Sequence, residues 1–529
     1  MYIPNLLLLV FRPYFNMETE EWFKLKKYPH IDFPLTIKDY TWVKNYVQDE
    51  EAISKHSFLP FIHKSIIKRK YRADESNPYR TKYGERKRKI GTPKVRHIYY
   101  ASHIDAMVFS YYNKLLSDAY EDKIKTEPFN NSIVAYRKIP LFQGSDKNKC
   151  NIDFAKSAFE FIKGNSDKKL SVIIADVTTF FDNLNHKVLK KQWTKVLRKT
   201  TLPQDHYNVF KVLTKLRYVK SNQLFKAYNK TMWVERGIPN DAKRKQVKRV
   251  GISSHHFFKE KNAVSYCTKK EFLKDNIGMV ISSSNTKGIP QGSPISATLA
   301  NIYMWDFDEV IFNQVDSIGG FYQRYSDDLI IVCEQEYEDE IIKFLRERIK
   351  NDEQLEIHPS KTKVYRFEEI AGIFKGFEID EESKEHNYNK TLKYLGFSFD
   401  GNRALIKSSG FSKFYRSMKR SFKKSASLAL NSKNPDKSLF KSRLYKRFTH
   451  RGAKRKMIFR PSKTNPAVYE KSKEFYWGNY LSYIYKANET MKTLNTTDVI
   501  KKQSRRLWKN FNKLMNFHES RINKTKSSN

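Results

Sequence analysis

Runs of apolar residues and their spacing indicate where the chain forms strands and helices. Ser171–Val177 is a nearly continuous apolar run of strand length, which predicts a strand buried on both faces of a sheet. Phe321 to Cys333 contains two apolar segments around a polar centre, which predicts two strands joined by a turn. Apolar residues at helical spacing predict helices over Ile104–Tyr120, about Asn185–Val219, Ile295–Ile302 and Glu338–Lys350.

Three further segments favour strands. Arg88–Ile98 is expected to form a hairpin, because Gly-Thr-Pro at its centre is turn chemistry. Leu355–Tyr365 and Thr391–Phe399 are expected to form one strand each. Strands and helices in this order do not alternate as in a doubly wound sheet, so we predict an α+β fold with an antiparallel sheet.

The same pattern divides the chain into three parts. Residues 1–84 form an N-terminal extension, residues 85–400 hold the predicted sheet, and residues 401–529 are basic with helical periodicity. Residues 220–285 are polar, basic and irregular, which suggests an insertion of loop character. No internal repeat and no long Gly/Ser/Pro linker separates the parts.

The positive charge of the chain indicates what kind of partner it binds. The chain has 100 Lys and Arg against 57 Asp and Glu, a formal charge of +43. Residues 401–529 contribute 33 basic against 6 acidic residues, interleaved with aromatic residues. Basic residues neutralise phosphates and aromatic rings stack on bases, so a nucleic-acid partner is favoured over a merely solvated helical face. The densest basic cluster consists of Arg443, Lys446, Arg447, Arg451, Lys454, Arg455 and Lys456.

Cysteine use and apolar run lengths bear on the compartment. Cys150, Cys267 and Cys333 are too far apart for a zinc motif or a disulfide framework, which fits a reducing cytoplasm. The run Leu6–Phe11 is too short to span a bilayer and has no basic residue before it, so neither a membrane anchor nor a signal peptide is expected. Met17 is an alternative start to Met1.

Acidic residues at two predicted strand ends are the candidates for chemistry. Asp176 lies at the end of the buried strand, and Asp327 and Asp328 lie at the turn of the predicted hairpin. Adjacent carboxylates repel one another unless a cation is bound between them. Phosphoryl transfer from a triphosphate uses two hard cations about 3.5–4 Å apart. An ordinary solvated turn explains an isolated Asp-Asp pair, but the apolar flanks and the second strand-end acid favour a site for two Mg²⁺ ions, with Mn²⁺ as an alternative.

Seven segments then carry a family resemblance. Their order along the chain resembles that of the core motifs of bacterial reverse transcriptases, including retron, group II intron and defence-associated (abortive-infection-like) enzymes. The segments are Lys94–Ile98, Ser132–Lys138, Asp176–Asp182, Gly288–Pro294, Tyr325–Asp328, His358–Thr362 and Tyr394–Phe397. The resemblance implies a right-hand polymerase with fingers and palm followed by a basic helical thumb.

The resemblance also implies roles for individual residues. Asp176 and Asp327 would be the principal metal ligands, assisted by the Val177 carbonyl and Asp328. Phe181 would be a steric gate that excludes the 2′-hydroxyl of a ribonucleotide. Gln291 and Gly292 would contact the incoming nucleotide, in a loop whose glycines allow the backbone to approach closely.

Further roles concern the triphosphate and the primer. Lys94 and Arg96 would bind the triphosphate, and Lys361 would protonate the departing pyrophosphate. Leu395 and Gly396 would form the primer grip, with Gly396 allowing close backbone packing. The basic residues after position 440, from Arg443 to Arg455, would bind nucleic-acid phosphates.

These roles predict an RNA-directed DNA polymerase that uses dNTPs, an RNA template and a DNA product, and has no membrane partner. The absence of the Val-Thr-Gly tripeptide of retron thumbs and the long N-terminal extension favour a defence-associated enzyme that copies a structured noncoding RNA. An intron maturase, a viral-type RNA polymerase and a palm-fold nucleic-acid binder without turnover are the alternatives. The oligomeric state, the template and the priming mode are not readable from the sequence.

Overall fold

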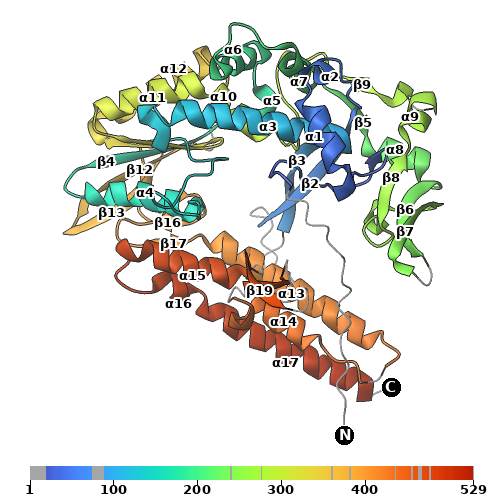
Figure 1. Ribbon diagram of the computed structural model, residues 1–529. Coiled ribbons are helices and arrows are strands. Elements are labelled where there is room, and N and C mark those ends of the chain that lie inside the picture. Colours follow the sequence, from blue (N-terminus) through green and yellow to red (C-terminus); the bar gives the residue numbers. More distant parts are fainter. Residues whose placement is uncertain are drawn as a thin grey trace. The chain divides into compact units, whose positions relative to one another are not determined.

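The structure is a computed structural model that describes residues 19–73, 88–238, 241–275, 277–358, 362–380, 383–434, 436–453, 457–462, 468–475 and 478–527 (Figure 1). The chain divides into two compact units. The first unit comprises residues 1–131, 177–310 and 347–356, and the second comprises residues 132–176, 311–346 and 357–529.

A six-stranded sheet forms the palm of the second unit. Its order is β10-β11-β4-β12-β13-β14, and each of its neighbouring pairs is antiparallel. The predicted α+β fold is therefore confirmed. The strands are β4 (Leu170–Asp176), β10 (Phe321–Tyr325), β11 (Asp328–Glu334), β12 (Lys363–Ile370), β13 (Ile373–Ile379) and β14 (His386–Asn387).

Strand β4 is covered on both faces, as its apolar sequence predicts. Leu170 and Val172 belong to a core shared with Phe159 of α4 (Asn151–Gly164). On the opposite face, Ser171 Oγ donates a hydrogen bond to Glu338 at the start of α12 (Glu338–Asn351). Because residues alternate between faces, an uninterrupted apolar run is what a central strand with two covered faces requires.

The second unit continues into helices after residue 407. A three-stranded sheet of β15 (Leu392–Tyr394), β16 (Phe397–Phe399) and β17 (Ala404–Ile406) precedes them. Met418, Phe422, Phe448, Phe511 and Met515 form part of the apolar core between these helices. The helices are α13 (Ser408–Leu430), α14 (Lys441–Phe448), α15 (Tyr480–Thr490), α16 (Val499–Gln503) and α17 (Arg505–Ser527), with the pair β18 (Met457–Pro461) and β19 (Tyr469–Phe475) between α14 and α15.

The first unit contains two four-stranded sheets and several helices. One sheet has the order β3-β2-β5-β9 and the other β1-β8-β6-β7. The strands are β1 (His30–Ile31), β2 (Phe61–Ala73), β3 (Arg88–Tyr100), β5 (Arg217–Lys220), β6 (Met232–Ile238), β7 (Asp241–Val250), β8 (Ala263–Cys267) and β9 (Ile281–Ser282). The helices include α1 (Tyr40–Gln48), α2 (Glu50–Ser54), α3 (His103–Ile124), α5 (Phe180–Asn183), α6 (His186–Leu197), α7 (Gln204–Thr214), α8 (Ser221–Tyr228), α9 (Lys269–Asp275) and α10 (Ser296–Tyr303); α11 (Trp305–Ser317) runs from this unit into the second.

The expected hairpin turn at Gly91-Thr92-Pro93 is wrong. These residues lie inside β3, which pairs with β2 along its length. Lys68 pairs with Lys94 and Lys70 pairs with Gly91, so one residue of β2 opposes two of β3 and the strand bulges. The Gly-Thr-Pro segment instead forms a bulge on an edge strand, where a proline without an amide hydrogen is tolerated.

Three other expectations need correction. The helical stretch expected over about Asn185–Val219 consists of the helices α6 and α7, but it ends in the strand β5. Residues 220–285 form the sheet of β6, β7 and β8 with α8 and α9 rather than loops. The strand expected from Leu355 begins only at Lys363, since the Leu355 amide instead closes α12 by bonding the Ile349 carbonyl.

Candidate functional site

The acidic turn closes the hairpin of β10 and β11. Tyr325 pairs with Asp328, so Ser326 and Asp327 form a two-residue loop. Ser326 has φ +63° while Asp327 is not left-handed, which is the φ pattern of a type II′ turn. That turn matches the twist of the flanking strands and fixes Asp327 at the tip.

The register of β11 against β4 brings the third acid to the same place. Asp328 lies directly opposite Asp176 in the antiparallel ladder, and Leu329 opposite Ala175. Directly opposed residues of such a ladder have Cα atoms about 4.5–5.5 Å apart and side chains on the same face. Asp176, Asp327 and Asp328 are all half-buried. We call these three residues the carboxylate edge.

The buried side chain of Arg324 supports the acidic turn by a hydrogen bond. Arg324 on β10 has 0% exposure, and its Nη1 donates a hydrogen bond to the Ser326 carbonyl at 3.2 Å. The Tyr136 hydroxyl lies 2.9 Å from Ser326 Oγ. The Arg324 backbone bonds to Ser132 and Val134, at 2.8 and 3.1 Å. The motif Ser132–Lys138 therefore acts as an added strand segment that holds the β10 side of the carboxylate edge.

The Asp328 carboxylate influences the pKa values of two neighbouring side chains, Tyr394 and Lys407. Burial, reinforced by Asp328, raises the pKa of Tyr394 well above its ordinary value. Burial lowers the pKa of Lys407, while the Asp328 carboxylate opposes that shift. Lys407 and Arg324 are thus two cations beside the carboxylate edge that sequence reasoning missed. A buried arginine gives no pattern signal, because arginine is ordinarily a surface residue.

The donor set fits hard divalent cations. Three carboxylates supply oxygen ligands, which Mg²⁺ prefers. Among the described residues, no three His, Cys, Asp or Glu side chains are arranged as a ready metal cage.

In the first unit, the loop Gly288–Pro294 is tied to two other motif segments. The Ile289 amide donates to the Phe181 carbonyl at 2.9 Å, and the Tyr99 amide donates to the Gln291 carbonyl at 2.8 Å. A Cβ on Gly288 would lie 2.7 Å from the Asp182 carbonyl oxygen, and one on Gly292 would lie 2.8 Å from that of Tyr99. The glycines are thus required by contacts within the protein itself.

The two adjacent phenylalanines of α5 lie in different environments. Phe180 is 3% exposed and belongs to the core, whereas Phe181 is only half-buried. Their rings meet edge to face with centroids 5.5 Å apart. Phe180 is therefore a core residue, whereas Phe181 keeps a partly accessible ring.

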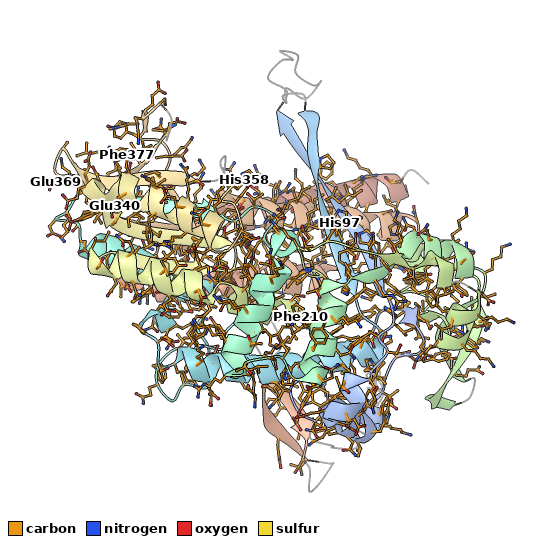
Figure 2. All side chains as sticks on the ribbon, turned by 90° about the horizontal axis from the view of Figure 1, so that it is seen from above. His97, Phe210, Glu340, His358, Glu369 and Phe377 are labelled. Carbon is orange, nitrogen blue, oxygen red and sulfur yellow. The ribbon has the colours of Figure 1, made fainter. Side chains whose placement is uncertain are left out.

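The predicted triphosphate ligands share one face of the β2–β3 hairpin. Opposed residues lie on the same face, and the register pairs Lys68 with Lys94 and Ile66 with Arg96. Lys94 and Arg96 are exposed. His97, labelled in Figure 2, lies on the opposite face of β3. Lys361, the predicted proton donor, lies outside the described residues.

The predicted primer grip is a tight turn. Tyr394 pairs with Phe397, and both central residues are left-handed, Leu395 with φ +39° and Gly396 with φ +97°. This φ pattern is that of a type I′ turn, so the single strand expected over Thr391–Phe399 is a hairpin. A Cβ on Gly396 would meet no atom closer than 3.8 Å. Glycine is needed there for its backbone angle and not for the close packing that we predicted.

Asn151 and the helices hold this turn in place. Asn151 Nδ2 donates to the Leu395 carbonyl at 2.9 Å and to the Tyr483 hydroxyl at 3.1 Å. The Lys407 amide donates to the Gly396 carbonyl at 3.0 Å.

The basic cluster predicted after residue 440 is partly described. Arg443, Lys446, Arg447 and Arg451 are exposed on α14 and the turn after it. Arg447 and Arg451 lie over the rings of Phe448 and Tyr445. Lys454 and Arg455 lie outside the described residues. A second basic surface, absent from the sequence prediction, is a groove of about 490 Å³ on α13 lined by Lys413, Arg416, Lys419 and Arg420, which we call the α13 groove.

None of the helices that the structure describes combines the length and apolarity needed to cross a bilayer.

The comparisons with solved structures give distant similarities. Apo telomerase from Candida tropicalis is 13% identical with a TM-score of 0.35, covering 75% of this chain and 60% of that chain. Telomerase from Candida albicans in complex with a fragment of telomeric RNA is 11% identical with a TM-score of 0.34, covering 72% and 53%. The chain thus spans about three fifths or less of these telomerase chains, and TM-scores this low carry no argument. No curated protein matches.

The family comparison is more specific. Residues 251–399 match the family described as "Reverse transcriptase (RNA-dependent DNA polymerase)". This segment holds the Gly288–Pro294 loop, Asp327 and Asp328, whereas Asp176 lies outside it. The pairing of β4 with β11 connects Asp176 to the matched segment. Over residues 251–399 the chain is therefore similar to the reverse transcriptase family, and the antiparallel sheet of the second unit joins this segment to Asp176.

Proposed function

We propose that the chain is an RNA-directed DNA polymerase that adds dNTPs at the carboxylate edge. The observation that carries this proposal is the register that sets Asp328 opposite Asp176, with Asp327 at the adjoining turn. A structural role alone does not explain three acids at one sheet edge, because their mutual repulsion opposes folding. Binding of divalent cations and triphosphates at this edge would explain the three acids.

The chemistry assigned to the carboxylate edge is phosphoryl transfer. Asp176, Asp327 and Asp328 would hold two divalent cations, with the Val177 carbonyl assisting. When bound, the cations supply activation of the primer 3′-hydroxyl and neutralisation of the pyrophosphate. The residues of the chain fix the positions of the oxygen ligands. Arg324 keeps the turn carbonyl bonded, so the carboxylates need not reorganise during the reaction.

Selection of the nucleotide is assigned to the first unit. Phe181 would press its accessible ring against C2′ of the sugar and reject a 2′-hydroxyl. Gln291 and Gly292 lie in a loop fixed by bonds to Phe181 and Tyr99, so their positions are set before the nucleotide arrives. Lys94 and Arg96 would bind the triphosphate, and Lys361 would protonate the leaving pyrophosphate.

The template is proposed to be a structured noncoding RNA, copied in antiphage defence. Support comes from the resemblance to defence-associated enzymes and from the positive charge after residue 400, which suits a large RNA partner. Sequencing the nucleic acid that co-purifies with the protein tests this part. Recovery of an intron RNA would instead favour a maturase.

Asp327→Asn tests the catalytic part. Metal-dependent incorporation of dNTPs into a primed RNA template should fall by more than the roughly 10–100-fold that altered outer-shell partners cost. RNA binding, measured by fluorescence anisotropy, should remain. Asp339→Asn is the matched control, since Asp339 is an exposed acid on α12 of the same unit. Equal activity of Asp327→Asn and the control would reduce the protein to a palm-fold nucleic-acid binder.

A further inference from the structure

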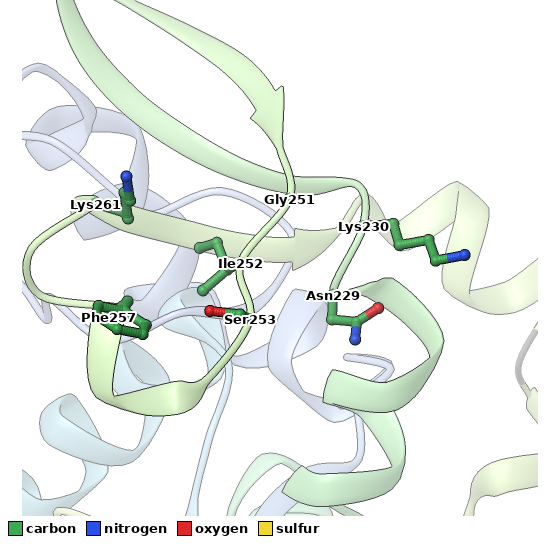
Figure 3. Close-up of a pocket in the computed structure, with 7 residues that line it drawn as sticks. All are labelled: Asn229, Lys230, Gly251, Ile252, Ser253, Phe257 and Lys261. Carbon is green, nitrogen blue, oxygen red and sulfur yellow. The ribbon is translucent and has the colours of Figure 1, made fainter.

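The segment 220–285 contains a pocket that the polymerase chemistry does not use. It has a volume of about 410 Å³ and lies at the base of the β6–β7 hairpin. We call it the hairpin pocket; Figure 3 shows its lining residues, Asn229, Lys230, Gly251, Ile252, Ser253, Phe257 and Lys261. Its size falls within the range of about 300–1,000 Å³ typical of small-ligand sites.

The backbone that forms the pocket is fixed. The Ile252 amide donates to the Asn229 carbonyl at 2.7 Å, which joins the end of α8 to the strand leaving β7. The Lys261 amide donates to the Phe257 carbonyl at 2.8 Å, which closes the opposite wall. Ile252 is buried and forms the floor with the core of this region. The pocket is therefore a preformed feature of this sheet.

Two neighbouring phenylalanines have separate roles here. Phe258 packs against Tyr266 of the core, with ring centroids 5.7 Å apart. Phe257 is left 40% exposed and lines the pocket. An exposed phenyl ring gains nothing by facing water, whereas it offers a flat face on which a nucleobase can stack.

The polar lining has the composition of a phosphate-binding surface. Lys230 and Lys261 lie on opposite sides of the pocket, with Lys261 beside Phe257 (Figure 3). Among the described residues, the side chains of Asn229, Lys230, Ser253 and Lys261 make no hydrogen bond or ion pair with the rest of the protein. None of the described residues that line the pocket is acidic. The surrounding segment 220–285 has 14 Lys and Arg against 5 Asp and Glu, which favours a polyanionic partner over a neutral ligand.

We propose that the hairpin pocket binds one nucleotide of a single-stranded nucleic acid. The base stacks on Phe257, the phosphates on its two sides contact Lys230 and Lys261, and Asn229 and Ser253 hydrogen-bond to the base edge or the sugar. Stacking and phosphate contacts are tolerant of sequence, so the site would hold a strand without selecting its sequence. This role is independent of catalysis at the carboxylate edge.

Photo-crosslinking tests the stacking. The full-length protein is mixed with a single-stranded RNA carrying 5-iodouracil, after its other basic surfaces have been saturated with an RNA–DNA duplex. We expect a cross-link to Phe257, lost in Phe257→Ala and kept in Tyr207→Ala, which removes another partly exposed ring of the first unit. Cross-links that map elsewhere would overturn the proposal. A free iodouridine nucleotide that cross-links as efficiently as the strand would also overturn it, in favour of a mononucleotide site.

The salt dependence of binding tests the two lysines. For single strands, the slope of log K against log salt changes by about 0.7 per phosphate contact. Lys230→Gln with Lys261→Gln should therefore reduce the slope by about 1.4. The control pair Lys269→Gln with Lys270→Gln removes the same charge from exposed positions of α9 and should leave the slope unchanged. Equal slopes for the two double variants would overturn the phosphate contacts.

A variant that fills the pocket tests whether loss of the cross-link could instead result from misfolding. A Cβ at Gly251 would lie 3.7 Å from the Lys230 carbonyl oxygen and 4.0 Å from both the Asn229 carbonyl oxygen and Lys230 Cα, which is ordinary van der Waals contact, and Gly251 is not left-handed. Gly251→Val should lose the Phe257 cross-link yet extend a short pre-annealed primer as the unmodified protein does. An undiminished cross-link in Gly251→Val would contradict binding inside the pocket.

Discussion

The carboxylate edge and the basic helices after residue 407 use charge in opposite ways. At the carboxylate edge, three acids are placed by sheet register and by one buried arginine, so each charge has a single position. On α13 and α14, many cations are placed only by helical spacing and remain exposed. One substitution in the palm should therefore remove a function, whereas one substitution on the helices should only weaken it.

The largest effect expected of the helices is collective. If they neutralise six to ten phosphates, the affinity for RNA should fall about 10³–10⁵-fold between 50 and 200 mM salt. Fluorescence anisotropy at several salt concentrations measures the slope and therefore the number of contacts. A flat response would mean that the positive charge of these helices does not bind phosphates.

Phe181→Ala tests whether the first unit also depends on single positions. Phe181 is one half-buried ring beside the core residue Phe180. Removing the ring should reduce discrimination against NTPs by on the order of 10², the size typical of rejection by pocket shape. The ratio of kcat/KM for a dNTP and the matching NTP measures the change. Phe181→Tyr keeps a ring and should keep the discrimination; equal use of both substrates by the unmodified protein would refute the gate.

The edge of the palm sheet could be predicted from the sequence, whereas the sheet of residues 220–285 could not. The apolar run of β4 and the apolar flanks of Asp327 and Asp328 predicted the sheet edge, because a strand with two covered faces leaves a distinctive pattern. The sheet of 220–285 could not be predicted. Its strand β7 is an edge strand rich in Lys and Arg, and charged edge strands lack the alternation by which strands are recognised.

Some candidate site residues were found from motif order in the sequence, whereas the roles of others become apparent only in the fold. Motif order singled out Gln291 and Gly292 as candidates, whereas the close contacts that require glycine at 288 and 292 come from Asp182 and Tyr99, which only the fold brings near. Arg324 was missed because its role depends on burial, and the α13 groove was missed because cations spaced along a helix resemble any solvated face.

Arg324→Met tests the buried support of the carboxylate edge. The substitution keeps most of the side-chain volume but leaves the Ser326 carbonyl without its donor. Loss of a hydrogen bond to a charged group costs about 1.5–3 kcal/mol, so the urea midpoint should fall accordingly. Arg403→Met removes an exposed arginine paired with Asp400 and should cost at most about 1 kcal/mol. Equal midpoints for the two variants would show that burial of Arg324 contributes nothing.

The smallest effect is expected from a single cation of the α13 groove. Arg420 is exposed, while its neighbours Arg416 and Lys419 contact Ser412 and Tyr415. Arg420→Gln should reduce the salt slope for a duplex by about 0.9, the contribution of one phosphate contact, and weaken binding equally for all sequences. Lys433→Gln, beyond the end of α13, removes the same charge outside the groove and should leave the slope unchanged. A loss of dNTP incorporation by Arg420→Gln as large as that of Asp327→Asn would contradict the division into single and collective charges, because it would make Arg420 a position that its neighbours cannot replace.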